Sequence, residues 1–259
     1  MRRMFGLAGL LAVSVGCEEW RAVQEAFEGF SEPTVVQALI LAVAEPESEA
    51  VDLSVSEFQP GTGATVFLAN ASDAQNIEEA PIEGATVSVH EIAAIEQGDG
   101  AYVIDPGTLE YAAGATWAVT AEVGEGSGKA SVVLPNAAAV TLPEQHTAGQ
   151  DLLVDVAGQG FHAALVVVFD VATGAVTWSN EPQDAQELYD FTHGSADVES
   201  VTIPGAAAFP AESAYAVGVA GMMHGDAESI EGFNTLLSTA MAGQMKMYPV
   251  STSALPTGG

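Results

Sequence analysis

Short apolar runs separated by turn-forming residues dominate the chain from residue 35 onward. In 116–123, Trp117, Val119 and Ala121 alternate with small or polar residues, and 85–89 shows the same period of two. One apolar and one polar face are typical of strands in an antiparallel sandwich. Apart from Gln37, the run 35–43 is apolar, which fits a strand buried on both faces, although periodicity alone also fits a helix. We expect further strands at 65–68, 101–104, 130–134, 152–156, 163–169, 176–178, 198–203, 214–220 and 245–250.

This pattern predicts a mainly β protein made of two tandem antiparallel β-sandwich domains. We place the first domain at 34–143 and the second at 144–250, because a polar patch at 144–147 interrupts the strand pattern. The second domain carries two expected helical insertions, at 183–189 and at 226–243. In the longer insertion Asp226 is the expected N-cap, and Ile230, Phe233, Leu237 and Met241 form one apolar stripe. Residues 251–259 are expected to be a disordered tail.

The N-terminus has the pattern of a secretory signal peptide. Arg2 and Arg3 supply a positive start, and residues 4–15 supply an apolar stretch that is too short to span a bilayer as a helix. Small residues then precede Cys17, the single cysteine of the chain. We therefore expect residues 1–16 to be removed and the protein to be exported.

The stretch that ends at Cys17 resembles a bacterial lipoprotein precursor. Gly16 fits the position before the cut, whereas Ser14 and Val15 stand where that family more often has Leu and then Ala or Ser. The resemblance implies that Cys17 is acylated and that the protein is anchored to the cell envelope. Glu18, where some bacteria use Asp for retention at the inner membrane, favours the outer membrane or the cell surface. The alternative is an ordinary cleaved signal peptide with an incidental cysteine.

Residues 17–33 form the expected tether between the lipid anchor and the first domain. Trp20, Val23, Phe27 and Phe30 recur at spacings of three and four, which predicts a short amphipathic helix. Beyond the anchor, no apolar stretch reaches the length of a membrane-spanning helix.

Residues 64–135 resemble the transthyretin-like and carboxypeptidase-regulatory-like modules. The likeness rests on Pro81, on Gly84 and Ala85 at the start of one strand, and on Gly100, Ala101 and Tyr102 at the start of the next. It implies a seven-stranded Ig-like β-sandwich that acts as a spacer or binding module. It supplies no catalytic residues.

The charge of the chain narrows the choice of partners and habitat. Asp and Glu number 35 against 5 Lys and Arg, which gives a formal net charge of -30. A field this negative repels phosphate, so nucleic acid is excluded as a partner. Because salt screens such self-repulsion, we expect a saline habitat. The alternatives are sequestration of divalent cations and a partner with a basic surface. A lone cysteine also excludes a disulfide framework.

No motif in the sequence indicates catalysis. None of the five histidines has a neighbouring histidine at metal-ligand spacing, so only distant positions could assemble a zinc site. A serine nucleophile lacks its usual elbow motif. Acidic residues cluster at 70–79 and 183–190, where Ca²⁺ binding is an alternative to simple solvation. Trp178 is the better candidate than Trp117 for an exposed, sugar-binding aromatic.

We therefore expect a non-enzymatic binding or structural module of the cell envelope, with no cofactor, catalytic residue or metal ligand assigned. Its expected partners are the membrane, through the lipid on Cys17, and an unidentified protein or glycan. Two alternatives remain: a Ca-dependent or carbohydrate-binding surface module, and a metal- or carboxylate-dependent hydrolase. The hydrolase would require several histidines or acids to converge in one pocket.

Overall fold

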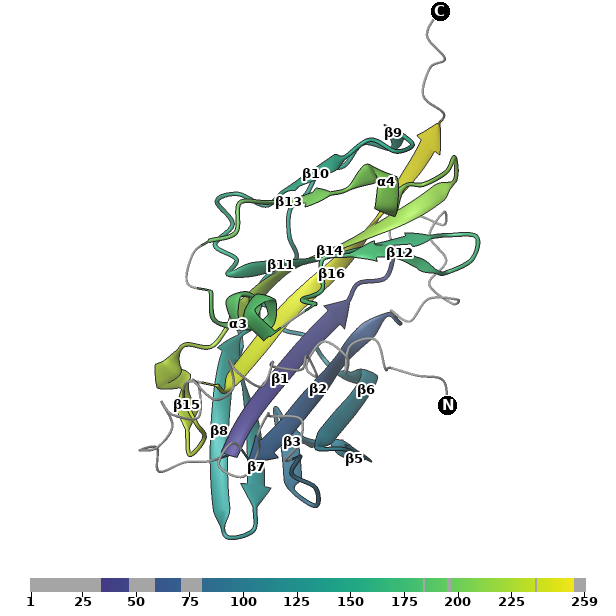
Figure 1. The fold of residues 1–259 in the computed structure, drawn as a ribbon. Coiled ribbons are helices and arrows are strands. Elements are labelled where there is room, and N and C mark those ends of the chain that lie inside the picture. Colours follow the sequence, from purple (N-terminus) through teal and green to yellow (C-terminus); the bar gives the residue numbers. More distant parts are fainter. Residues whose placement is uncertain are drawn as a thin grey trace, which may run out of the picture.

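The structure, a computed structural model, describes residues 34–46, 59–70, 81–183, 185–194, 197–235 and 237–253. Most of these residues lie in strands that form one large and two smaller sheets (Figure 1). The large sheet contains β1 (Thr34–Val43), β2 (Gly61–Asn70), β5 (Ile95–Gly98), β6 (Ala101–Leu109), β9 (Gln145–Thr147), β11 (Ala163–Asp170), β12 (Val176–Ser179), β14 (Ala214–His224) and β16 (Thr239–Ser253). The prediction of a mainly β protein of the β-sandwich class is thus confirmed.

Two smaller sheets and three short helices complete the described part of the chain. The larger of these sheets holds β3 (Thr86–Val89), β4 (Ile92–Ala93), β7 (Thr116–Val123), β8 (Gly126–Val133) and β15 (Ile230–Glu231). The other pairs β10 (Leu152–Asp155) with β13 (Ser200–Ile203). The helices are α3 (Ala185–His193), α4 (Gly205–Ala208) and the 3-10 turn η3 (Ala227–Ser229).

The large sheet has the order β12-β11-β14-β16-β1-β2-β6-β5, with β9 added at one end of β16. Its centre is a parallel pair: β1 runs beside β16 from Gln37 opposite Thr239 to Val43 opposite Met245. Strands in this position are covered on both faces, which is why residues 35–43 are apolar except for Gln37. β1 is therefore a strand, and a helix is ruled out for this run.

Side chains on the two faces of the large sheet enter three apolar cores. On one face, core A lies between β1, β2, β6 and the five-stranded sheet, and includes Trp117, Tyr102 and Ile40. Core C lies between β11, β14 and the β10-β13 pair. Core B covers the opposite face, and Phe191 of α3 packs against it. β16 contributes to all three, with Ala240 in core A, Met241 in core B and Val250 in core C.

The predicted helix at 226–243 is wrong. Asp226 does cap a turn, because its side chain accepts a hydrogen bond from the Ser229 N–H, but only η3 follows. Gly232 has a φ of 68°, which ends helical geometry, and β16 begins at Thr239. Phe233 packs over Gly128 of β8, where any larger residue would collide with the ring. The apolar stripe thus reflects burial against two different strands.

Other expected boundaries shift by a few residues. The predicted short helix at 183–189 corresponds to α3, which begins at Ala185 and continues to His193. The closing strand extends beyond 245–250, so Ser251–Ser253, expected in the disordered tail, are paired with β9 instead. The signal peptide, Cys17 and the tether helix of 17–33 lie outside the described residues.

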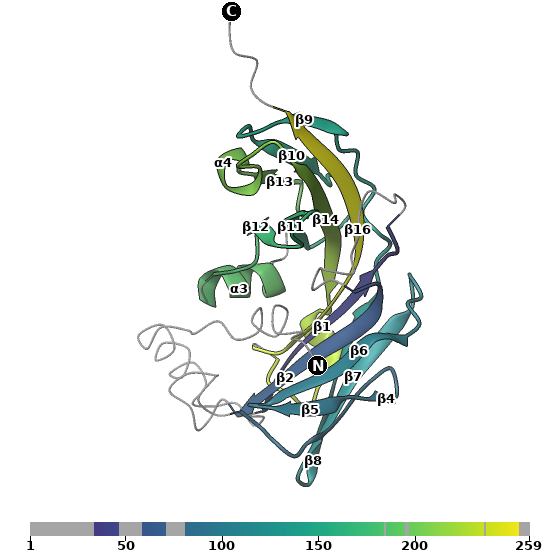
Figure 2. The ribbon, with the colours of Figure 1, turned by 90° about the vertical axis from the view of Figure 1, so that its right-hand side faces the viewer.

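The expected boundary between residues 143 and 144 is crossed by the large sheet. β1, β2, β5 and β6 come from the first half, whereas the remaining strands of this sheet come from the second. Figure 2 shows β14 and β16 curving along the molecule beside β1 and β2. In each half a smaller sheet packs on the large sheet, but the backbone hydrogen bonding of the large sheet continues from one half to the other. Their independence as domains stays a prediction, and the shared sheet makes it testable.

We predict that Ile40→Ala in β1 destabilises both halves together. Ile40 is fully buried in core A, so losing its side chain should cost about 2–4 kcal/mol. Hydrogen exchange should quicken in parallel in 116–123 and in 163–170, because β1 and β16 join the two regions. Ile95→Ala is the matched control, since Ile95 is 62% exposed. Loss of protection confined to 116–123 would show that the halves unfold independently.

Candidate functional site

Three of the five histidines come together at one end of β14, although they are far apart in the sequence. His162 precedes β11 and His224 ends β14. These two strands are antiparallel, with Ala163 opposite Met222, so both histidines lie at the same end of the pair. His193 is the last residue of α3 and interacts electrostatically with His224. We call these three residues the histidine cluster.

Two rings of the cluster are in direct contact. The ring centroids of His162 and His224 are 4.2 Å apart, and the ring planes are inclined by 48°. The backbone N–H of His224 donates to Nδ1 of His162 at 3.3 Å. Because Nδ1 of His162 accepts this hydrogen bond, the proton of the neutral ring resides on Nε2.

The protonation of His193 follows from its neighbour. The Thr192 hydroxyl donates its single hydrogen to the carbonyl oxygen of Leu188 at 2.8 Å. It can therefore only accept from Nδ1 of His193, which lies 2.7 Å away. The neutral His193 ring thus carries its proton on Nδ1, and its Nε2 is the basic nitrogen. That Nε2 atom is buried.

His224 is the most perturbed member of the cluster. Burial, followed by the charges that His162 and His193 can carry, lowers the pKa of its ring to about 4. Its Nε2 atom is buried and has no hydrogen-bond partner in the described part of the chain. His224 is therefore neutral at pH 7, and any proton it gains enters a site that does not stabilise it.

The hydroxyl beside His193 is not arranged as a nucleophile. The Thr192 hydroxyl lies 2.7 Å from Nδ1 of His193, but Thr192 is only 2% exposed and its hydrogen is donated to a helix carbonyl. Among the described residues, no three His, Cys, Asp or Glu side chains converge closely enough to hold a metal ion. His224 is the member of the cluster whose pKa the fold shifts.

We predict that the protein loses stability between pH 6.5 and pH 4. The pKa of His224 falls from 6.5 to about 4 on folding, so the unfolded chain binds the proton more readily. The stability that the neutral ring contributes is complete above pH 6.5 and is lost as the pH falls towards 4. Because the ring is only half-buried, we discount the full linkage value and expect about 1–2 kcal/mol.

Thermal melting across this pH range measures the effect. In His224→Phe the fall in midpoint should be smaller than in the native chain, because the titrating group is gone. His146→Gln is the control and should keep the native slope. A native slope in His224→Phe would mean that the ring does not titrate as proposed.

The other two histidines have structural contacts of their own. His90 is exposed and its ring stacks on Trp117, with centroids 4.8 Å apart and planes inclined by 11°. Nε2 of His146 lies 2.8 Å from the carbonyl oxygen of Gln150, and its ring meets Phe209 edge-on. Neither belongs to the histidine cluster. The five histidines are thus partly gathered and partly dispersed.

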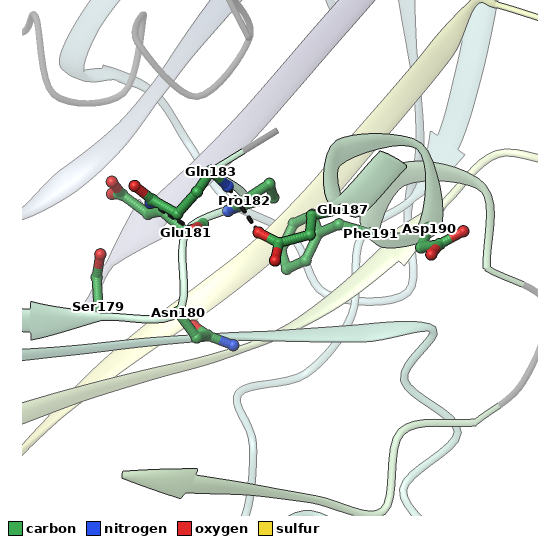
Figure 3. A pocket seen from close by; sticks show the side chains of 8 residues that line it. All are labelled: Ser179, Asn180, Glu181, Pro182, Gln183, Glu187, Asp190 and Phe191. Carbon is green, nitrogen blue, oxygen red and sulfur yellow. Dashed lines mark hydrogen bonds between the residues drawn. The ribbon is translucent and has the colours of Figure 1, made fainter. Parts of the chain in front are cut away.

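A pocket of about 450 Å³ lies where β12 leads into α3 (Figure 3). It contains part of the acidic segment 183–190 that the sequence marks as a possible Ca²⁺ loop. One of its carboxylates, Glu187, accepts a hydrogen bond from the backbone N–H of Gln183 at 2.8 Å. The lining residues are Ser179, Asn180, Glu181, Pro182, Gln183, Glu187, Asp190 and Phe191. Calcium binding here stays a prediction, and 71–79 of the other acidic segment lies outside the described residues.

The two aromatic candidates differ in exposure. Trp117 is 1% exposed and belongs to core A, as expected from its position on the apolar face of its strand. Trp178 is only half-buried and packs at the margin of core C. It is therefore the more accessible of the two, although it is tied to the core.

No helix among the described residues is long and apolar enough to cross a membrane. Cys17, the predicted lipidation site, lies outside those residues, so its acylation stays a prediction.

No protein-family model and no curated protein matches the chain. Several solved structures show a weak similarity. The central fibronectin-III array of RIM-binding protein is 11% identical, with 78% of this chain and 68% of that chain covered and a TM-score of 0.20. A run of domains from titin is 10% identical, with 86% and 67% covered and a TM-score of 0.22. Extracellular domains 3–5 of Drosophila OTK are 9% identical, with 72% and 70% covered and a TM-score of 0.17. Similarities this weak carry no argument about function.

Proposed function

We propose that this protein is an exported, lipid-anchored module of the cell envelope that binds or spaces other components without catalysing a reaction. The observation that carries the proposal is the position of Cys17. It is the only thiol of the chain and directly follows a signal-type apolar stretch. Acylation at this position would supply the two or more chains that stable membrane anchoring requires.

The fold supports a spacer role beyond the anchor. Tandem domains joined by a linker bend at the linker, whereas here β1 of the first half is hydrogen-bonded to β16 of the second half, which in turn pairs with β14. β16 has 15 residues, which corresponds to about 50 Å of extended strand. A continuous sheet of this length holds the two ends of the molecule at a fixed separation. That rigidity suits a protein that presents a surface at a distance from the membrane.

The chemistry of the described residues favours binding over catalysis. The histidine cluster has a buried threonine as its neighbouring hydroxyl, and the acidic pocket beside α3 contains no histidine. The pocket favours a second candidate function, the recognition of a cation or a glycan. Its carboxylates, amides and single aromatic ring are the groups that such ligands need.

Substituting Cys17→Ser should release the protein from the membrane fraction. Without the sulfur no thioether-linked lipid can form, so the mass added by acylation should disappear and the protein should partition into the aqueous phase of a detergent separation. The matched control moves the thiol: Ser253→Cys in the Cys17→Ser background should not restore anchoring. If the native chain and Cys17→Ser partition alike, the signal peptide is an ordinary one.

We further propose a saline habitat, from the net charge of -30. The thermal midpoint should rise between 0.1 M and 2 M NaCl, because screening relieves repulsion among surface carboxylates. KCl at equal ionic strength should act in the same way. A thermal midpoint that does not change with NaCl but rises with millimolar CaCl2 would favour the divalent-cation alternative instead.

A further inference from the structure

We propose that the chain carries a binding site for a soft monovalent metal ion, Cu(I), formed by the thioether sulfurs of Met222 and Met241 and by Nε2 of His224. The three residues come from the paired strands β14 and β16 (Figure 1). The site needs neither the lipid anchor nor the acidic pocket beside α3. It goes beyond the binding or spacing role proposed above, because it gives the chain a specific inorganic ligand.

Methionine is unevenly distributed along the chain. The sequence contains seven methionines, and the five that follow Met4 all lie on the neighbouring strands β14 and β16. Four of these are buried in core B, namely Met222, Met241, Met245 and Met247. The flanking strands β1 and β11 contribute only hydrocarbon side chains to the same core. Thioether sulfur is a soft ligand that suits Cu(I), so the sulfurs concentrate one kind of metal chemistry on this face.

A glycine makes room for one of the two proposed sulfur ligands. Met222 lies opposite Gly243 in the antiparallel pairing of β14 with β16. A Cβ atom on Gly243 would collide with Sδ of Met222, so this sulfur lies over the backbone of β16. Met241 is two residues from Gly243 on the same face, a separation of about 7 Å along an extended strand. Diagonal neighbours of this kind are within reach of long side chains, so the two sulfurs can share one ion.

His224 adds a nitrogen ligand at the same place. It lies directly opposite Met241 and two residues from Met222, and side chains at opposite positions of an antiparallel pair share a face. Its Nε2 atom is buried and has no hydrogen-bond partner in the described part of the chain. Buried polar atoms are nearly always paired, so an unpaired nitrogen beside two thioethers indicates an ion as its partner. The site uses neither His162 nor His193.

The ligand set suits Cu(I) better than Zn²⁺ or Ca²⁺. Two thioethers and one neutral imidazole carry no negative charge, whereas protein sites for the divalent ions use thiolates, several imidazoles or carboxylates. Within the described ranges, no three His, Cys, Asp or Glu side chains are close enough to supply such a set. A single positive charge is also less costly to place beside an apolar core than a double one. The net charge of -30 favours the arrival of any cation.

The position of the site also gives the ion a route. Met222 and Met241 are 0% and 1% exposed, whereas His224 is half-buried and ends its strand. The imidazole is therefore the ligand that first meets an ion from solvent, and the two sulfurs lie behind it. The ion enters and stays as Cu(I), so binding involves no electron transfer.

Anaerobic titration of the full chain with Cu(I) tests the site. Cys17→Ser serves as the background, because a free thiol at Cys17 would itself bind Cu(I). Competition against a coloured Cu(I) chelator should show an ion held by the protein, and X-ray absorption should show sulfur and nitrogen bonded to it. Failure to compete with the chelator, or an ion bonded to nitrogen and oxygen without sulfur, would overturn the proposal.

Methionine-to-leucine variants then assign the ion to this face of the sheet. Met222→Leu and Met241→Leu should each weaken Cu(I) binding at least tenfold, because leucine keeps the apolar volume and removes the sulfur. Met223→Leu is the matched control, since Met223 lies on the opposite face of β14, against cores A and C. Met247→Leu removes a sulfur of the same core remote from His224, and it should also bind as the background does.

Thermal melting without metal shows that each variant is folded before its affinity is compared. Added Ag(I), a redox-inert analogue of Cu(I), should raise the melting midpoint of the background and of Met223→Leu, because a ligand that binds the folded state stabilises it. The rise should be smaller in Met222→Leu. Undiminished Cu(I) binding in both Met222→Leu and Met241→Leu, or an equal loss in Met223→Leu, would refute the site.

Discussion

The parallel pairing of β1 with β16 is the constraint on which the rest of the structure depends. It places an N-terminal and a C-terminal strand at the centre of one sheet, and both faces of that sheet are then covered by apolar cores. The backbone N–H of Val36 also donates to the Ser238 hydroxyl across a sequence separation of 202 residues. Apart from this junction, strands of the two halves pair in the described part of the chain only where the short β15 lies beside β8. The continuity of the molecule, and any role as a rigid spacer, follows from it.

Two electrostatic environments coexist in this chain and act in opposite directions. The overall negative charge attracts protons and should make an exposed histidine easier to charge. Inside the histidine cluster, burial and neighbouring rings make His224 harder to charge. Salt screens the long-range field, whereas it hardly reaches a buried contact. Responses to salt and to acid therefore have separate physical origins in this protein.

Local patterns were enough to predict several strands but not their partners. The alternation around Trp117 and Val119 predicts β7 with its observed bounds. Burial of every second residue produces an alternation of apolar and polar residues that can be read from neighbouring positions. The apolar stripe at Ile230, Phe233 and Met241 led to the wrong prediction of a helix, because these residues are buried by strands that are remote in sequence. The histidine cluster was missed for the same reason: it requires knowing that the start of β11 lies beside the end of β14. Tertiary pairing of this kind leaves no signal in a single sequence.

The order in which the chain is synthesised gives the pairing of β1 with β16 a further consequence. β1 emerges early, yet the neighbour that covers one of its edges is the last described strand. Contacts of such long range form slowly, because a very large loop must close first. Until then β1 offers an unpaired apolar edge, which is prone to aggregation. A chain of this design benefits from remaining unfolded until its full length has been delivered, and the export that we propose would impose that delay.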